Sequence, residues 1–174
     1  MVDNCEFDIN MTSQSCSGDA DKTYYAGLFG EYKTHSGSKL TLNQVVAKGT
    51  KIVRDNDHYL SQLIACVDTS NNPGTLPTIE MTDITVSGSV ENTNATTTCC
   101  LGGLIAEMNE EKSDGSIHKS WDSDKGRENW QDFENERTIL NIDGLTISDF
   151  TLKNSSGALR SSGLLGFWWL DVYA

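Results

Sequence analysis

Three stretches of the chain share one pattern of apolar positions, separated by steps of two, three and two residues. Steps of two are typical of a strand with one face turned inward. The step of three breaks this alternation, so a strand that keeps its apolar face inward must bend there. The pattern predicts bent strands with corners at 43–44, 82–83 and 143–144. The apolar residues are Leu40, Leu42, Val45 and Ala47, then Ile79, Met81, Ile84 and Val86, then Leu140, Ile142, Leu145 and Ile147.

Each bent strand is followed by one more apolar residue and then by a polar link. We expect the apolar residues Ile52, Val90 and Leu152 to begin the next inward-facing side. The polar links should lie outside, because buried polar groups need partners. The links are 54–57, 91–94 and 153–156. A weaker first copy alternates at Cys5, Phe7, Ile9 and Met11.

A second element occurs four times and consists of two large apolar residues held between small ones. Glycine before the apolar pair accepts backbone angles that other residues avoid and lets neighbouring chain segments approach closely. We therefore expect a tight corner at each copy. The copies are Ala26-Gly27-Leu28-Phe29-Gly30, Ser61-Gln62-Leu63-Ile64-Ala65, Gly102-Gly103-Leu104-Ile105-Ala106 and Ser162-Gly163-Leu164-Leu165-Gly166.

Strands and corners that recur along one chain predict a stack of similar coils. The predicted fold is all-β, a segment of a right-handed parallel β-helix spanning 1–174 as one domain. Between 107 and 137 the spacing of the copies lengthens, and this segment holds 10 of the 25 acidic residues. We expect it to form an acidic loop inserted on one side of the stack. The apolar end after Leu164 suggests that the chain is an excerpt of a longer one.

The glycine-leucine elements resemble GLUG-type and related repeats of bacterial cell-surface proteins, which include adhesins built on right-handed parallel β-helices. The copy at Leu63 departs from the repeat because it lacks glycine on either side, and Ala106 replaces the final glycine of its copy. The resemblance implies an extracellular scaffold, adhesive or fibre-forming, without catalytic residues to carry over. The matching residues are Gly27-Leu28-Phe29-Gly30, Gly103-Leu104-Ile105-Ala106 and Gly163-Leu164-Leu165-Gly166.

The composition limits the classes of partner that the chain is expected to bind. The net charge of −12 argues against nucleic acid, since phosphate binding needs clustered lysine and arginine. No run approaches the roughly 18 to 20 apolar residues that a membrane helix needs. Hydrophobic residues make up 37% of the chain, which suits a thin core with much surface. The expected partners are further coils of the same chain, another protein or a glycan, and no cofactor is predicted.

The five cysteines allow one short disulfide. Cys5 and Cys16 are close enough in sequence to close a small loop, and buried thiols are the alternative. No Cys/His pattern has zinc spacing.

The acidic loop carries the candidate ligand-binding residues. Asp122, Asp124 and Glu128 offer oxygen ligands for calcium, although Lys125 and Gly126 stand where a third ligand belongs. A solvated loop is the simpler interpretation. Trp121 and Trp130 can stack on a sugar ring, or they can fasten the loop to the body.

Catalysis is the alternative to a structural role. Asp55 and Asp57 beside His58, or Asp122 with Asp124, offer the paired carboxylates that a glycan-cleaving β-helix enzyme needs. Such an enzyme gathers its acids on one strand face, whereas acids on separate edges are solvated surface. The sequence predicts a non-enzymatic structural or adhesive section of a cell-surface or extracellular protein that associates end to end. The alternatives are a carbohydrate-active enzyme, a polysaccharide lyase or hydrolase, and a glycan-binding module.

Overall fold

The chain folds from strands alone over the part that the structure describes. This computed structural model describes residues 1–12, 23–53, 58–68, 75–93, 99–109, 138–155 and 159–168. Within these ranges every helix or strand is a β-strand, and every strand pair is parallel. The predicted all-β class is confirmed.

The strands form three parallel sheets, which we call A, B and C. Sheet A contains β1 (Val2–Asp8), β2 (Met11–Thr12), β5 (Lys39–Lys48), β6 (Thr50–Val53), β9 (Thr78–Asn92) and β12 (Ile139–Asn154). Sheet B contains β3 (Thr23–Tyr25), β7 (His58–Ser61), β10 (Cys99–Gly102) and β13 (Leu159–Ser162). Sheet C contains β4 (Phe29–Lys33), β8 (Ile64–Asp68), β11 (Ile105–Asn109) and β14 (Leu165–Trp168).

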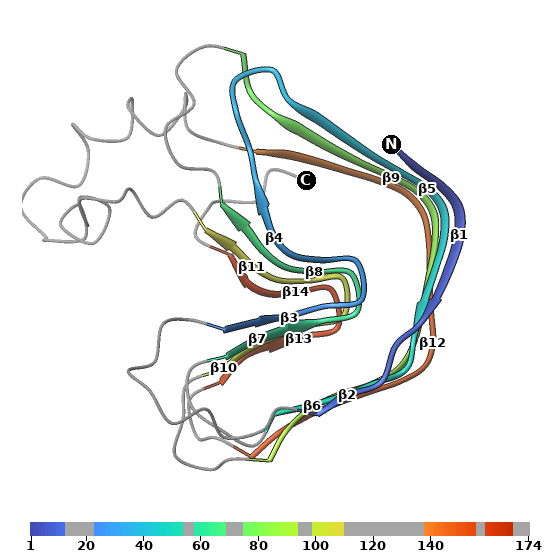
Figure 1. Ribbon diagram of the computed structural model, residues 1–174, viewed down its shortest axis with the longest axis vertical. Coiled ribbons are helices and arrows are strands. Elements are labelled where there is room, and N and C mark those ends of the chain that lie inside the picture. Colours follow the sequence, from blue (N-terminus) through green and yellow to red (C-terminus); the bar gives the residue numbers. More distant parts are fainter. Residues whose placement is uncertain are drawn as a thin grey trace, which may run out of the picture.

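The chain passes through sheets A, B and C in the same order four times, and we call each pass a coil. Coil 1 comprises β1 to β4, coil 2 comprises β5 to β8, coil 3 comprises β9 to β11, and coil 4 comprises β12 to β14. Figure 1 shows the coils lying over one another, with sheet A as the curved outer wall. Sheets B and C form an arch whose closed end points toward that wall (Figure 1).

The first bend in sheet A, which we call corner 1, lies where the step of three predicted it. The residues at this corner lie at the same place in each coil, directly after residues that pair from coil to coil, and each has a positive φ angle. A left-handed backbone turns the strand while the apolar side chains on both sides keep facing inward. The four residues are Asn4 (φ 49°), Gln44 (φ 51°), Asp83 (φ 52°) and Gly144 (φ 77°).

A second bend, corner 2, follows after Ala47 and Val86. Gly88 of coil 3 has a φ of 89°, and a Cβ atom added there would overlap the carbonyl oxygen of Gly49 in coil 2. Only glycine fits such a position, because it combines a left-handed backbone with close contact to another backbone. Coil 4 has one extra residue here, and its register with coil 3 shifts between Ile147 and Phe150.

The largest core lies between sheets A and C, in a column that each coil extends. Leu42 and Met81 are buried there, and Ile142 packs against them. The predicted common interior is confirmed. From the turn between sheets B and C, Leu63 and Leu104 reach the same core. Burying a leucine contributes about 2 kcal/mol relative to leaving it exposed, so the repeated column is a main source of stability.

Two inward positions differ from the prediction. Register places Lys51, not Ile52, beside Val90 in the inward column, and Lys51 is buried. Asn92, expected in an exposed link, is also buried, and its Nδ2 donates to Oδ1 of Asn154 at 2.9 Å. An asparagine can occupy this interior because the next coil supplies a matching one.

The first copy is more regular than its sequence suggested. Val2 pairs with Leu42 and Cys5 pairs with Val45, so coil 1 also has a step of three, across Asn4. Alternation alone missed Val2, because the step of three separates it from the residues that follow.

The predicted inserted loop begins later than 107. Residues Glu107, Met108 and Asn109 belong to strand β11. Residues 110–137 lie outside the described residues, so the acidic loop stays a prediction.

Candidate functional site

The turn between sheets B and C is where the recurring glycine-leucine element lies. Gly27 N donates to Gln62 O at 3.2 Å, and Gln62 N donates to Gly103 O at 3.2 Å, so this turn is hydrogen-bonded from coil to coil. A Cβ atom on Gly103 would overlap the oxygen of Gly163. The expected tight corner with close approach of neighbouring coils is confirmed.

Coil 2 places glutamine at this position, and its side chain is fully buried. Gln62 Nε2 donates to the carbonyl oxygens of Gly49 at 2.9 Å and Ser89 at 3.3 Å. Its Oε1 accepts a hydrogen bond from Lys51 Nζ. Gln62 therefore links the B–C turn to corner 2 of coils 2 and 3.

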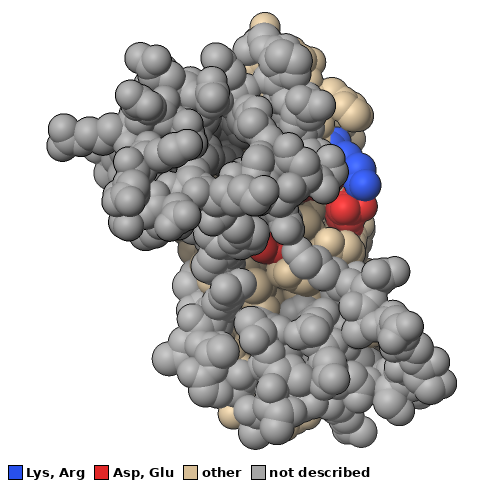
Figure 2. All heavy atoms as spheres, turned by 90° about the vertical axis from the view of Figure 1, so that its left-hand side faces the viewer, with Lys and Arg blue, Asp and Glu red and all other residues tan. Residues whose placement is uncertain are grey.

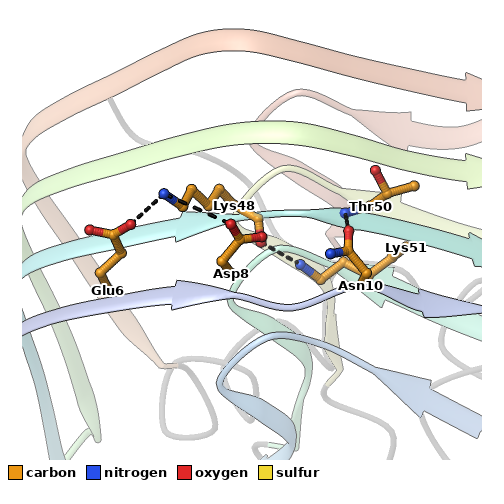
Figure 3. A network of polar contacts seen from close by, with 6 residues as sticks. All are labelled: Glu6, Asp8, Asn10, Lys48, Thr50 and Lys51. Atoms are coloured by element: carbon orange, nitrogen blue, oxygen red, sulfur yellow. Dashed lines mark hydrogen bonds and ion pairs between the residues drawn. The ribbon is translucent and has the colours of Figure 1, made fainter.

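Lys51 completes this buried group. Its side chain is 1% exposed, and Nζ also donates to Lys48 O at 3.3 Å. Burial lowers the pKa of Lys51 from 10.5 to about 8, because desolvation disfavours the ammonium, while the charge of Asp8 opposes the shift. Figure 3 shows the Lys51 side chain pointing back toward the backbone of Lys48.

The surface beside Lys51 carries an ion-pair group that joins coils 1 and 2. Lys48 Nζ forms ion pairs with Glu6 and, at 3.9 Å, with Asp8 (Figure 3). The hydrogen bond with Glu6 raises the pKa of Lys48. Asn10 Oδ1 accepts from Thr50 N at 2.8 Å and holds corner 2 of these coils together. The ion pairs are exposed, so they add little stability.

A second polar group lies inside the arch between sheets B and C. Tyr59 packs against Tyr24 with ring centroids 5.2 Å apart and the rings tilted by 33°, and Glu107 is 3% exposed. Burial raises the pKa of Tyr59, and the charge of Glu107 and its hydrogen bond raise it further. The thiols Cys66 and Cys100 are buried beside them.

This arch group does not fit acid–base catalysis. A general acid or base works best with a pKa near the operating pH, and the pKa of Tyr59 is displaced away from that range. Tyr59 and Glu107 are also enclosed rather than open to a substrate. Figure 2 views the molecule from the open side of the arch, and the described surface visible there is mostly uncharged. We assign this group to packing of the arch.

Most of the predicted site residues lie outside the described residues. These are Trp121, Trp130, Asp122, Asp124, Glu128, Asp55, Asp57 and Cys16. The calcium, glycan and paired-carboxylate hypotheses therefore stay predictions. Among the described residues, no three His, Cys, Asp or Glu side chains lie close enough to hold a metal ion.

Cys5 is the one predicted site residue whose surroundings are described. It is half-buried, and its thiol donates to Asp3 O at 3.2 Å. It faces inward beside Val45. A disulfide with Cys16 stays a prediction, since the second cysteine is not described.

The two ends of the coil stack present apolar side chains that the inner coils bury. In coil 3, Ile84 and Val86 are buried, whereas in coil 4 their partners Leu145 and Ile147 are half-buried and 41% exposed. In coil 1, Val2 and Phe7 are likewise only half-buried. Within the described residues, β1 pairs only with β5, and β12 pairs only with β9. This leaves one edge of each strand open to a partner.

No helix among the described residues is long and apolar enough to cross a membrane. Comparisons of the chain with protein-family models, with curated proteins and with solved structures found no match. The candidate site consequently depends on the geometry alone, and the end faces of the stack are its most distinctive surface.

Proposed function

We propose that the chain is a segment of a right-handed parallel β-helix that serves as a non-enzymatic structural or adhesive section of a cell-surface or extracellular protein. Parallel strands of one sheet that are joined by a crossover are right-handed in about 98% of cases, which supports the handedness. The resemblance of the glycine-leucine elements to GLUG-type repeats supports the location and the role.

One observation carries the proposal: along the part of sheet A before corner 2, an unbroken register joins coil 1 to coil 2, coil 2 to coil 3 and coil 3 to coil 4. Leu42 pairs with Val2 on one side and with Met81 on the other, and Met81 pairs with Ile142. The faces of coils 1 and 4 are therefore the two halves of an interface that the chain already makes three times. An interface whose halves lie at opposite ends of the described coil stack can join copies of this chain head to tail into a fibre.

The function is tested by end-to-end association of the 174-residue chain. Sedimentation velocity over a concentration series, in high salt to screen the net charge of −12, should show oligomers that lengthen with concentration. An Ile147→Asp variant places a charge in the exposed apolar face of coil 4, and we expect at least tenfold weaker association.

A matched control adds the same charge away from the ends. Thr85 is the neighbour of Val86 on the outward face of coil 3, and Thr85→Asp should associate like the wild type. A wild type that stays monomeric at every concentration contradicts the proposal. Equal weakening by both variants contradicts it as well, since the ends would then have no special role.

Glycan binding is a separate prediction for the acidic loop. A glycan array probed with the wild type and with Trp121→Ala distinguishes a glycan-binding module from a scaffold. Cleavage of a polysaccharide on the same array would favour the carbohydrate-active enzyme.

A further inference from the structure

The outward-facing row beside corner 1 changes its charge along the stack. From coil 1 to coil 4 this corner row consists of Asp3, Asn43, Thr82 and Asp143, which pair in succession. The two inner residues are uncharged, and Asn43 Nδ2 donates to Asp3 Oδ1 at 2.6 Å. Both carboxylates stand on the outermost coils and are exposed. Inside one molecule, no two charges of the corner row are therefore neighbours.

We infer that Asp3 and Asp143 weaken and thereby regulate the stacking of a second copy of this chain on the first. The inference rests on the end-to-end association proposed above. A second copy that continues the repeated register brings its Asp3 directly beside Asp143 of the first copy. Neighbouring strands lie about 4.8 Å apart, and like charges directly opposite each other are destabilising.

The apolar columns identify the second copy as the occupant. Continued register places Ile142 against Val2, Leu145 against Cys5 and Ile147 against Phe7, extending the columns of the coil–coil interfaces within the chain. Shape and hydrophobic character therefore favour a second copy. The carboxylates of the corner row, Asp3 and Asp143, oppose this stacking.

Among the described side chains, the neighbouring rows supply no compensating cation. Continued register places Glu6 of the second copy beside Thr146, which is uncharged. Lys48, which forms ion pairs with Glu6 and Asp8, belongs to the same copy as those carboxylates. Lys153 of β12 lies beyond corner 2 and forms an ion pair with Glu91 at 3.4 Å. No described side chain consequently balances the repulsion between Asp3 and Asp143 in this part of sheet A.

Charge exchange tests the inference. Sedimentation velocity at low and high salt compares the wild type with Asp143→Lys, with Asp3→Lys and with the double variant. Each single variant turns the repulsion into an attraction, and we expect association to strengthen about tenfold at low salt. Added salt should strengthen association of the wild type and weaken it for the single variants, because screening acts on both signs. In the double variant two lysines face each other across the interface and repel. Association should therefore return to weak, although the magnitude of the net charge is smallest in this variant.

Two variants separate the local contact from net charge. Asp143→Asn and Thr85→Lys each change the net charge by one, at the end of the stack and away from it. Only Asp143→Asn should strengthen association at low salt. Circular dichroism of each variant verifies folding. Asp143 is exposed and Thr85 lies on the outward face, so we expect both sites to accept these substitutions.

The outcomes distinguish this inference from the function beneath it. If all variants associate as the wild type does, or if Thr85→Lys acts like Asp143→Asn, the inference is wrong and end-to-end stacking stands. If no variant associates at any salt concentration, the stacking itself is wrong and the inference with it. Opposite salt dependence of the wild type and Asp143→Lys, with weak association of the double variant, supports it.

Discussion

Coils 2 and 3 follow the same path through three sheets, yet they fill two equivalent interior positions with opposite chemistry. Where coil 3 has Val90 in sheet A, coil 2 has Lys51. Where coil 3 has Gly103 in the B–C turn, coil 2 has Gln62, and the two turns are hydrogen-bonded to each other. In coil 3 Val90 packs with the apolar Leu101, whereas in coil 2 the lysine and the glutamine bond to each other.

The difference shows that the two exceptions in coil 2 depend on each other. A buried ammonium is costly unless it is hydrogen-bonded, and a buried amide also needs partners. Lys51 and Gln62 are 11 residues apart in the chain and meet only because the arch folds back toward sheet A. Gln62 also bonds to carbonyl oxygens at corner 2 in both coils. A repeat can therefore vary at one position if a contacting position of the same coil varies with it.

Placing the glutamine of coil 2 at the equivalent position of coil 3 should have the largest effect on stability. Gly103→Gln adds a side chain where Gly163 O leaves no room for a Cβ atom, and Val90 offers the amide no partner. We expect the free energy of unfolding to fall by more than about 4 kcal/mol, measured by urea denaturation followed by circular dichroism. Gly103→Ala, which tests the overlap alone, should remain foldable and lose less. Wild-type stability in both variants would contradict the close approach of coils 3 and 4.

Removing half of the pair in coil 2 should have the next largest effect. Gln62→Leu takes the side-chain acceptor from the buried ammonium of Lys51, which keeps the carbonyl oxygen of Lys48, and takes the donor from the carbonyl oxygens of Gly49 and Ser89. Leaving a buried charge without its partner costs about 3 kcal/mol. Urea denaturation measures the loss. A change below about 0.5 kcal/mol, typical of surface substitutions, would show that the amide is not needed.

The backbone path could be predicted from sequence because the inward columns impose one spacing on every coil. The step of three in the apolar pattern located corner 1, and Gln44 and Asp83 have the positive φ angles that a bend there requires. The glycine before Leu104 located the turn between sheets B and C. Both signals are local, since each depends on residues that are neighbours in the sequence.

The interior polar groups could not be predicted, because their burial depends on register between distant segments. Lys51 follows Ala47 at the same offset as Val90 follows Val86, but a lysine does not match the apolar pattern, which favours Ile52 at the inward position. Asn92 is buried only because Asn154, 62 residues away, stacks on it. The residues of the predicted acidic loop lie outside the described residues, so that part of the site is still a prediction.

A double-mutant cycle sharpens the comparison of coils 2 and 3. Lys51→Met removes the charge and keeps an apolar stem of similar length, so it should cost only about 1 kcal/mol, the price of an unsatisfied Gln62 Oε1. In a Gln62→Leu background the same substitution should restore about 2 kcal/mol, because no unpaired ammonium remains. The coupling is measured by urea denaturation of the four proteins. Additive effects would mean that Lys51 and Gln62 stabilise the fold independently.

The smallest expected effect is a dependence of stability on pH that coil 3 cannot share. The pKa of Lys51 is about 8 in the folded chain and lies near its ordinary 10.5 when the chain unfolds. Between these values the unfolded chain binds more protons, so stability rises with pH through this window. From pH 7 to pH 9 the free energy of unfolding should increase by about 1 kcal/mol. Below pH 7 Lys51 is charged in both states and contributes no slope.

Lys51→Met isolates this slope from that of other groups. The raised pKa of Tyr59 acts in the opposite direction, since its unfolded form releases a proton first near pH 10. Measurements between pH 7 and pH 9 avoid that range. The wild type should then gain unfolding free energy relative to Lys51→Met as pH rises. A constant difference would mean that the pKa of Lys51 is not lowered in the folded chain, so that water or the hydrogen bonds to Gln62 and Lys48 fully offset the cost of burying the ammonium where coil 3 has Val90.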